Sequence, residues 1–208
     1  MRYCIVIAIL GLVPALGSHT INRDNPAIDR VEEDWQLVIQ STDVPSAGPQ
    51  ITTTMCPGPL QDHPDVNFNL NYRGGPQFLP GGLQIEVFDG QDVLTTTASR
   101  NEPLATDGET ITWTQRLYLS AGTVSYQVQS GKSTTWGNFG TNELSVAFTS
   151  SLTDLTGYSP EISISKSGVG WQSNHVTSMQ LIQARYYSGD TLIKTDSTAR
   201  AVHLLDGN

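Results

Sequence analysis

Two short stretches of the chain combine tryptophan with amide side chains, a combination suited to binding sugars. The first, TTWGNFG, contributes Trp136, Asn138 and Phe139, and the second, GVGWQSN, contributes Trp171 and Asn174. An exposed aromatic ring can stack on a sugar while a nearby amide bonds its hydroxyls. Aromatics among glycines can also plug the end of a sandwich, which is the more common role. The sequence leaves both roles open.

A third stretch, QDHPDVNFN, places the oxygen ligands of Asp62, Asp65 and Asn67 at short spacing. Calcium takes about six to eight oxygen ligands from carboxylates, amides and carbonyls. The stretch does not match a calcium-loop motif, and a polar loop before a strand is the simpler interpretation. Ca²⁺ is therefore kept as a hypothesis for these residues, and no other cofactor is expected.

Signatures of common enzymes are missing from the sequence. The segment GYSPE (157–161) lacks the last glycine of a nucleophile elbow, and no phosphate-binding glycine loop occurs. The histidines are spread along the chain rather than clustered as zinc ligands would be. They are His19, His63, His175 and His203.

A sandwich glycosidase would need two carboxylates that face one cleft. Glu86 and Asp89 in LQIEVFDG are three positions apart, so they point to opposite faces of a strand. No other acidic pair stands out in the sequence. We therefore expect a protein without catalytic activity and rank a glycosidase last of three functional classes.

The elements that would position these residues are strands, and the clearest is the hairpin within Glu109–Gly140. Apolar and polar residues alternate in both arms around a turn at Ala121-Gly122. Folding about this turn brings both apolar rows to one face, and a one-residue slip would expose them. The expected pairs are Leu119 with Val124, Leu117 with Tyr126, and Gln115 with Val128.

Short alternating segments between Gly- and Pro-rich turns continue along the chain, without a long helical pattern. We predict an all-β fold, a single antiparallel β-sandwich of jelly-roll or concanavalin-like type, with little or no helix apart from a signal peptide. The acidic run Glu32-Glu33-Asp34 is expected on a solvated edge strand. Ile162 and Ile164 are expected to begin a short strand. Asn174–Tyr187 could hold a helix at Met179–Ala184, but the turn at residues 188–190 and the β-prone residues 191–193 favour a hairpin.

Residues 1–17 have the features of a secretory signal peptide. Arg2 precedes an apolar run at Tyr3–Val13, and Ala15-Leu16-Gly17 fits a cleavage site. The run is shorter than the roughly 20 residues of a membrane span. We expect residues 18–29 to form a polar spacer and residues 30–206 to form one β-sandwich domain. The mature chain would be secreted or held in the cell envelope, without membrane insertion.

Charge and cysteine content narrow the possible partners. The formal net charge of −9 disfavours nucleic acid and anionic membrane surfaces. Cys4 would leave with the signal peptide, so Cys56 has no partner within the mature chain and is expected to be a small buried side chain.

Several segments resemble known families in pattern. GGLQIEV, TWTQRLYL, VSYQVQSG and WGNFG are loosely similar to concanavalin A-like lectins and glucanases and to laminin-G-like jelly rolls. The Glu-x-Asp-x-x-Glu motif of the glucanases is absent, so this resemblance implies a fold and not that activity. RVEEDWQLVI, PGGLQIEVFDG, TTWGNFG, TGYSPEISISKSGVGW and ARAVH more closely resemble a group of uncharacterised secreted bacterial β-sandwich proteins, which implies export but assigns no site residues.

Together these features predict a secreted, non-catalytic module with a structural or adhesive role in the cell envelope or the extracellular space. The alternative is a lectin-like carbohydrate-binding module, and a glycoside hydrolase-like enzyme comes third. The expected partners are an extracellular glycan or proteins of the envelope or matrix.

Overall fold

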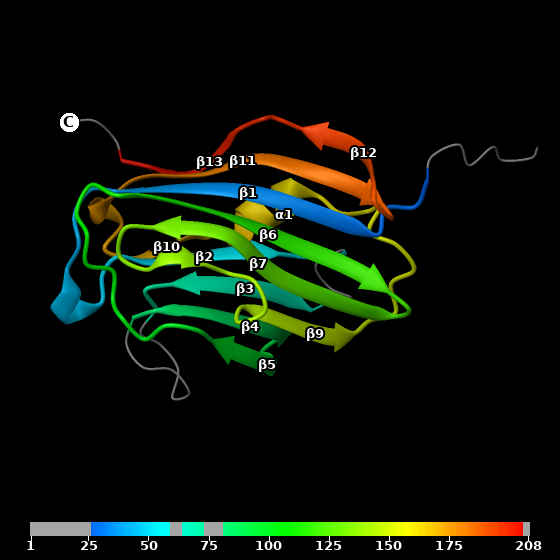
Figure 1. Cartoon of the computed structure of the whole chain (residues 1–208), viewed down its shortest axis with the longest axis horizontal. Helices are drawn as coiled ribbons and strands as arrows, with labels where there is room; N and C mark the ends of the chain where they lie inside the picture. Colours follow the sequence, from blue (N-terminus) through cyan, green and yellow to red (C-terminus); the bar gives the residue numbers. More distant parts are fainter. Residues whose placement is uncertain (1–25, 59–63, 73–80, 206–208) are drawn as a thin grey trace, which may run out of the picture.

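Two antiparallel sheets pack face to face in a computed structural model that describes residues 26–58, 64–72 and 81–205 (Figure 1). This arrangement confirms the predicted all-β sandwich. The predicted signal peptide and Asp62 lie outside the described residues. In the described part of the chain, no helix has the length and apolar character needed to cross a bilayer.

The larger sheet has the strand order β12-β11-β1-β6-β7-β8, with β13 paired to β11 and β9 paired to β7. Its central strands are the long ones, so the middle of this sheet is a continuous, rigid surface. The bounds are β1 (Arg30–Ile39), β6 (Thr110–Ser120), β7 (Thr123–Ser133), β8 (Gly137–Phe139), β9 (Ser145–Thr149), β11 (Val176–Ser188), β12 (Thr191–Asp196) and β13 (Arg200–Leu204).

The smaller sheet has the order β10-β2-β3-β4-β5. Two single-turn 3-10 helices, η1 (Val44–Ser46) and η2 (Ser173–His175), lie in loops. The strand bounds are β2 (Gln50–Met55), β3 (Asp65–Leu70), β4 (Leu83–Asp89), β5 (Asp92–Ala98) and β10 (Gly168–Trp171).

The short helix α1 (Pro160–Lys166) occupies the position where a strand was expected at Ile162 and Ile164, so that prediction was wrong. Proline at the first helical position has a backbone angle suited to a helix start. Glu161 in the first turn and Lys166 in the last turn also favour a helix, because they oppose the helix dipole. The helix packs against β2.

The predicted hairpin is β6–β7, and its register is confirmed. Leu119 lies opposite Val124, and Leu117 opposite Tyr126, as the alternation requires. The predicted strand within Asn174–Tyr187 is also confirmed, because β11 and β12 form a hairpin.

The expected edge position of Glu32-Glu33-Asp34 was wrong, because β1 lies between β6 and β11 at the centre of the larger sheet. Glu33 points inward with Trp35, while Glu32 and Asp34 face solvent. The parity of a strand therefore divides the acidic run between the two faces.

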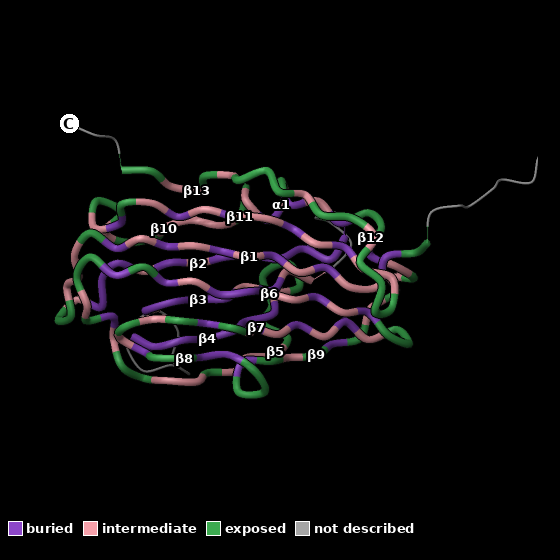
Figure 2. Tube along the Cα trace, turned by 45° about the horizontal axis from the view of Figure 1, so that its top comes forward, coloured by how far each residue is buried: buried purple, intermediate pink, exposed green. Residues whose placement is uncertain are grey.

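Buried apolar side chains from both sheets fill the space between them. Figure 2 marks the buried residues of both sheets along the chain trace. Trp35 and Trp113 stack at a centroid distance of 6.2 Å, and Phe68 of the smaller sheet meets Trp113 edge-on at 5.9 Å. These contacts lock the two sheets together through large rings, which supply much of the buried apolar area.

Candidate functional site

The structure places the aromatic rings of the first sugar-binding candidate inside the protein. Trp136 is 2% exposed and donates its Nε1–H to the Glu102 carbonyl at 2.8 Å. Phe139 is buried and packs against both Trp136 and Phe68. Asn138 is exposed, with its carbonyl bonded by Arg100. The rings therefore plug the sandwich and cannot stack on a sugar.

The second candidate stretch is exposed but isolated. Trp171 is 54% exposed at the end of β10, an edge strand of the smaller sheet. Asn174 is also exposed, in η2. The intervening Gln172 is held by Asp43 at 2.8 Å and by Ser46. One exposed indole beside one amide remains as a possible stacking surface.

The residues proposed as calcium ligands make other contacts. Asp65 accepts a hydrogen bond from the Cys56 thiol at 2.9 Å and forms an ion pair with Lys166. The side-chain amide oxygen of Asn67 accepts a hydrogen bond from the Thr54 hydroxyl at 2.8 Å. The described residues contain no group of three or more His, Cys, Asp or Glu side chains that could hold a metal. The Lys166 ammonium pairs with the Asp65 carboxylate, which would have to bind calcium, so Asp65 and Asn67 fit a calcium site poorly.

Cys56 is buried, as expected, and its thiol is unsuited to nucleophilic chemistry. Burial, together with the hydrogen bond to Asp65, raises the thiol pKa far above its ordinary value. The thiolate is the reactive form of cysteine, and this environment suppresses it.

The outer face of the larger sheet, the side turned away from the core, carries rows of polar side chains that could meet a ligand. The register aligns residues from five strands in one row across this face. The row runs Arg185, Glu32, Arg116, Gln127, Ser145.

A second row on the outer face lies beside the first. It runs Tyr187, Arg30, Tyr118, Ser125, Ala147. The Arg30 guanidinium lies 4.0 Å from the centroid of the Tyr187 ring, and that of Arg116 lies 5.6 Å from the centroid of the Tyr118 ring. Each arginine is thus oriented by an aromatic neighbour.

One end of the outer face is an internally paired ion cluster. Arg185 contacts Glu32 at 3.2 Å and Asp34 at 2.9 Å. Asp34 also accepts hydrogen bonds from Gln183 and Thr114, each at 2.7 Å. Partial burial acts to raise the Asp34 pKa, but the hydrogen bonds from Arg185, Gln183 and Thr114 outweigh it and hold this pKa below its ordinary value. Asp34 therefore stays ionised, and the side chains of the cluster are bonded to one another.

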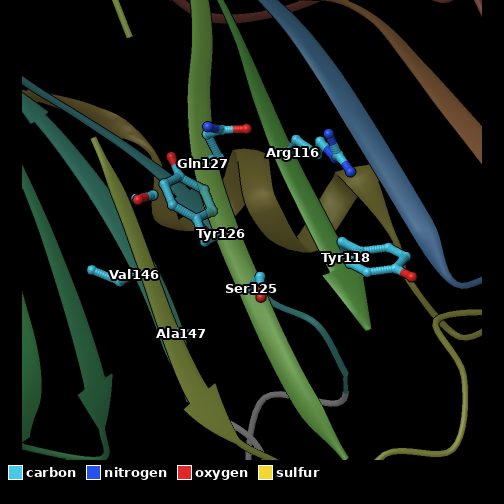
Figure 3. A pocket seen from close by; sticks show the side chains of 8 residues that line it. Arg116, Tyr118, Ser125, Tyr126, Gln127, Val146 and Ala147 are labelled. Atoms are coloured by element: carbon cyan, nitrogen blue, oxygen red, sulfur yellow. The ribbon is translucent and has the colours of Figure 1, made fainter. Parts of the chain in front are cut away.

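The other end of the outer face is a depression of about 330 Å³ between β6, β7 and β9 (Figure 3). Arg116, Tyr118 and Gln127 border it, and Tyr126 and Val146 also line it. Among the described residues, Arg116 has no carboxylate within ion-pair distance, and the Gln127 amide has no hydrogen-bond partner. These groups are therefore free to bind a ligand.

Glu33 is the carboxyl group with the most strongly raised pKa, and it lies in the core rather than at a surface. It is 0% exposed and accepts hydrogen bonds from Tyr158 at 2.5 Å and from Trp35 at 3.0 Å. Tyr158 also contacts the Ser163 hydroxyl of α1 at 2.7 Å. Burial raises the Glu33 pKa to about 7, against the opposing effect of these hydrogen bonds.

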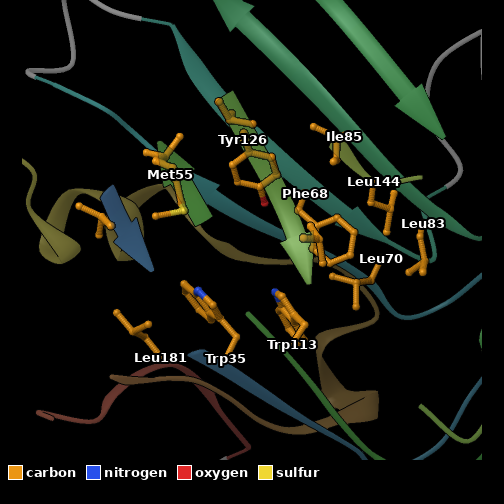
Figure 4. Close-up of a cluster of buried hydrophobic side chains, with 14 of the residues drawn as sticks. Trp35, Met55, Phe68, Leu70, Leu83, Ile85, Trp113, Tyr126, Leu144 and Leu181 are labelled. Carbon is orange, nitrogen blue, oxygen red and sulfur yellow. The ribbon is translucent and has the colours of Figure 1, made fainter. Parts of the chain in front are cut away.

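Gln115, the inner-face neighbour of Glu33 on β6, is buried in the same way. Its amide contacts the Tyr126 hydroxyl at 2.7 Å and Thr53 of the smaller sheet at 2.6 Å. Figure 4 shows Tyr126 in the core with the Trp35 and Trp113 indoles. These polar groups join the two sheets and have no access to a substrate.

Comparisons of the chain with protein-family models, with curated proteins and with solved structures find no match. The site must therefore be judged from its own geometry.

The binding candidates predicted from the sequence did not include Arg116, Tyr118 and Gln127, which border the depression. Their outward orientation was readable from the alternation in β6 and β7. In the described part of the chain, Arg116 lacks an acidic partner because Glu32 of β1 pairs with Arg185 and Arg30 instead. The sequence of the hairpin does not indicate this pairing.

Proposed function

We propose that this chain is an exported, non-catalytic β-sandwich module that binds an extracellular polymer through the outer face of its larger sheet. Its role would be structural or adhesive, in the cell envelope or the extracellular matrix. The observation that carries this proposal is the depression bordered by Arg116, Tyr118 and Gln127, whose side chains have no hydrogen-bond or ion-pair partner among the described residues. The signal-peptide features of residues 1–17 support export.

The position of these groups favours binding without rearrangement. Arg116 and Tyr118 lie on β6, which is hydrogen-bonded to β1 and β7 on its two sides. Gln127 lies on β7, which is flanked by β6 and β9. Side chains on paired central strands are held more precisely than side chains on loops, so little order has to be gained on binding.

The acidic residues support a non-catalytic role. Glu32 and Asp34 are two positions apart on the outer face of β1, the spacing that a strand-borne glycosidase pair could use. A general acid needs a raised pKa, whereas Asp34 has a lowered one and is bonded to Arg185. Glu33 and Glu86 have raised pKa values, but Glu33 is enclosed by the core, and Glu86 is 8% exposed and accepts a hydrogen bond from Asn69.

A carbohydrate is the ligand class that this depression favours. Its border offers a guanidinium, a phenol, an amide and the hydroxyls of Ser125 and Ser145. Hydroxyl-rich ligands are matched by such a mixture of donors and acceptors. The volume of about 330 Å³ is at the small end of ligand sites, which suits one unit of a polymer.

The proposal is tested by binding of the mature chain to a panel of insoluble polysaccharides and to purified envelope or matrix material. Two aromatic truncations, Tyr118→Ala and Trp171→Ala, compare the outer face with the exposed indole. We expect Tyr118→Ala to weaken binding and Trp171→Ala to leave it unchanged, with both variants folded by circular dichroism. Loss of binding in Trp171→Ala alone would move the site to β10, and no binding to any material would overturn the proposal.

A further inference from the structure

The arrangement of charges on the outer face leaves Arg116 without a counter-ion. In the strand register, Glu32 lies opposite Arg185 on one side and opposite Arg116 on the other. Glu32 bonds to Arg185 at 3.2 Å and lies 3.5 Å from Arg30. Among the residues that the structure describes, no carboxylate remains for Arg116, although the whole chain carries a net charge of −9.

Building on the proposed function, we propose that the depression at Arg116 binds a carboxylate-bearing sugar unit of an acidic polysaccharide. The Arg116 guanidinium would hold the carboxylate through paired N–H donors, a geometry that arginine provides and lysine does not. The Tyr118 ring contacts the Arg116 guanidinium and orients it. Gln127, Ser125 and Ser145 would bond the sugar hydroxyls around it.

The surrounding charges permit an anion to approach this place. The other arginines of the outer face, Arg30 and Arg185, are balanced by Glu32, Asp34 and Asp190. The depression itself is lined by no acidic residue. Arg116 is therefore a local positive site on an otherwise acidic protein, and an exposed ion pair with a ligand there meets little repulsion from adjacent side chains.

The structure of the depression favours a sugar over an acidic peptide. Peptides are commonly bound by addition to a free strand edge or by apolar anchors in a groove. β7 is paired on both sides, with β6 and β9, and among the described strands β9 pairs only with β7, so the free edge of β9 lies on the side away from β6 and β7. Its apolar lining is confined to Tyr126, Val146 and Ala147, and its other residues are polar or tyrosine.

The test uses two polymers with the same backbone, polygalacturonate and its carboxyl-reduced, neutral form. The full mature chain is titrated with each by calorimetry, together with Arg116→Gln and Arg116→Lys. Lys194→Gln on β12 is the matched control, because it removes one positive charge from an exposed side chain far along the same sheet. Poly-glutamate serves as the acidic peptide probe.

We expect the chain to bind polygalacturonate about tenfold or more tightly than the reduced polymer. Arg116→Gln should remove that preference, Arg116→Lys should restore it only in part, and Lys194→Gln should keep it. Equal binding of the two polymers, with loss in Tyr118→Ala, would overturn the carboxylate inference and leave the proposed function standing. Equal losses in Arg116→Gln and Lys194→Gln, or tighter binding of poly-glutamate, would overturn it as well. Failure to bind any polysaccharide would overturn the carboxylate inference, and failure to bind envelope or matrix material as well would overturn the proposed function.

Discussion

Charged side chains have different surroundings on the two faces of strands β1 and β6. On the inner face, Glu33 is fully enclosed, yet each of its carboxyl oxygens has a hydrogen-bond donor. On the outer face, Arg116 is partly exposed and has no ionic partner among the described residues. A buried polar group needs hydrogen-bond partners within the protein, whereas a group exposed to solvent is hydrated and stays available to a ligand. The carboxyl group with the most strongly raised pKa thus belongs to the scaffold, and an outer-face arginine without an ionic partner in the described chain belongs to the candidate site.

The largest effect is expected from the inner face, at Trp113. This side chain stacks on Trp35 and contacts Phe68 across the sandwich. Trp113→Ala should lower the free energy of unfolding by about 3–5 kcal/mol. The control is Thr112→Ala, the outward neighbour on β6, which should stay within about 0.5 kcal/mol. Denaturant unfolding of both variants provides the measurement, and equal losses would contradict the assignment of faces.

The second prediction concerns the pH dependence that Glu33 creates. Its pKa is raised from 4.5 to about 7 in the folded chain, so the folded state binds the proton more tightly than the unfolded state. Stability is therefore greatest below pH 4.5 with respect to this group, and it is lost as pH rises through about 7. The loss amounts to about 3 kcal/mol.

Glu33→Gln replaces the acid by a neutral group of similar shape and should remove this contribution. The difference in unfolding free energy between Glu33→Gln and the parent chain should shift by about 3 kcal/mol in favour of the variant between pH 4.5 and pH 8. Denaturant titrations at a series of pH values measure it. A difference that does not change with pH would show that Glu33 is ionised or solvated in the folded state.

The third prediction separates the two ends of the outer face. Arg185→Ala leaves Glu32 and Asp34 without their main partner and should cost about 1–3 kcal/mol of stability at pH 7. Arg116→Ala removes no ion pair and should change stability by less than about 0.5 kcal/mol. Thermal or denaturant unfolding of both variants decides the matter. A similar loss of stability in Arg116→Ala would show that Arg116 has a structural role, contrary to this prediction.

The sequence predicted the parts of the fold that depend on local alternation. The register of β6–β7 follows from two apolar rows and one turn, so it could be predicted without knowledge of the rest of the chain. Glu33 was misplaced because an acidic triplet resembles a solvated edge, although its parity with Trp35 already indicated the inner face. The neighbours of β1 are distant in sequence, and only their pairing shows that the strand is central.

The candidate site was less predictable for a related reason. Trp136 and Trp171 have similar flanking residues, yet one is a core plug and the other is exposed. Their burial depends on packing between distant segments, as the Trp136 contacts with Glu102 and Phe139 show. Alternation identified the polar side of β6 and β7. Whether Arg116 has an ionic partner depends on the ion pair between Glu32 of β1 and Arg185 of β11, which only the structure shows.

The central claim is that ligand is bound at the outer face of the larger sheet and not at the exposed indole. A nuclear magnetic resonance titration of the ¹⁵N-labelled mature chain with an oligogalacturonate tests this most directly. We predict that the perturbed amide signals cluster on β6, β7 and β9, around Arg116, Gln127 and Ser145. Perturbations centred on Trp171 and Asn174, with the signals of the outer face unchanged, would contradict it.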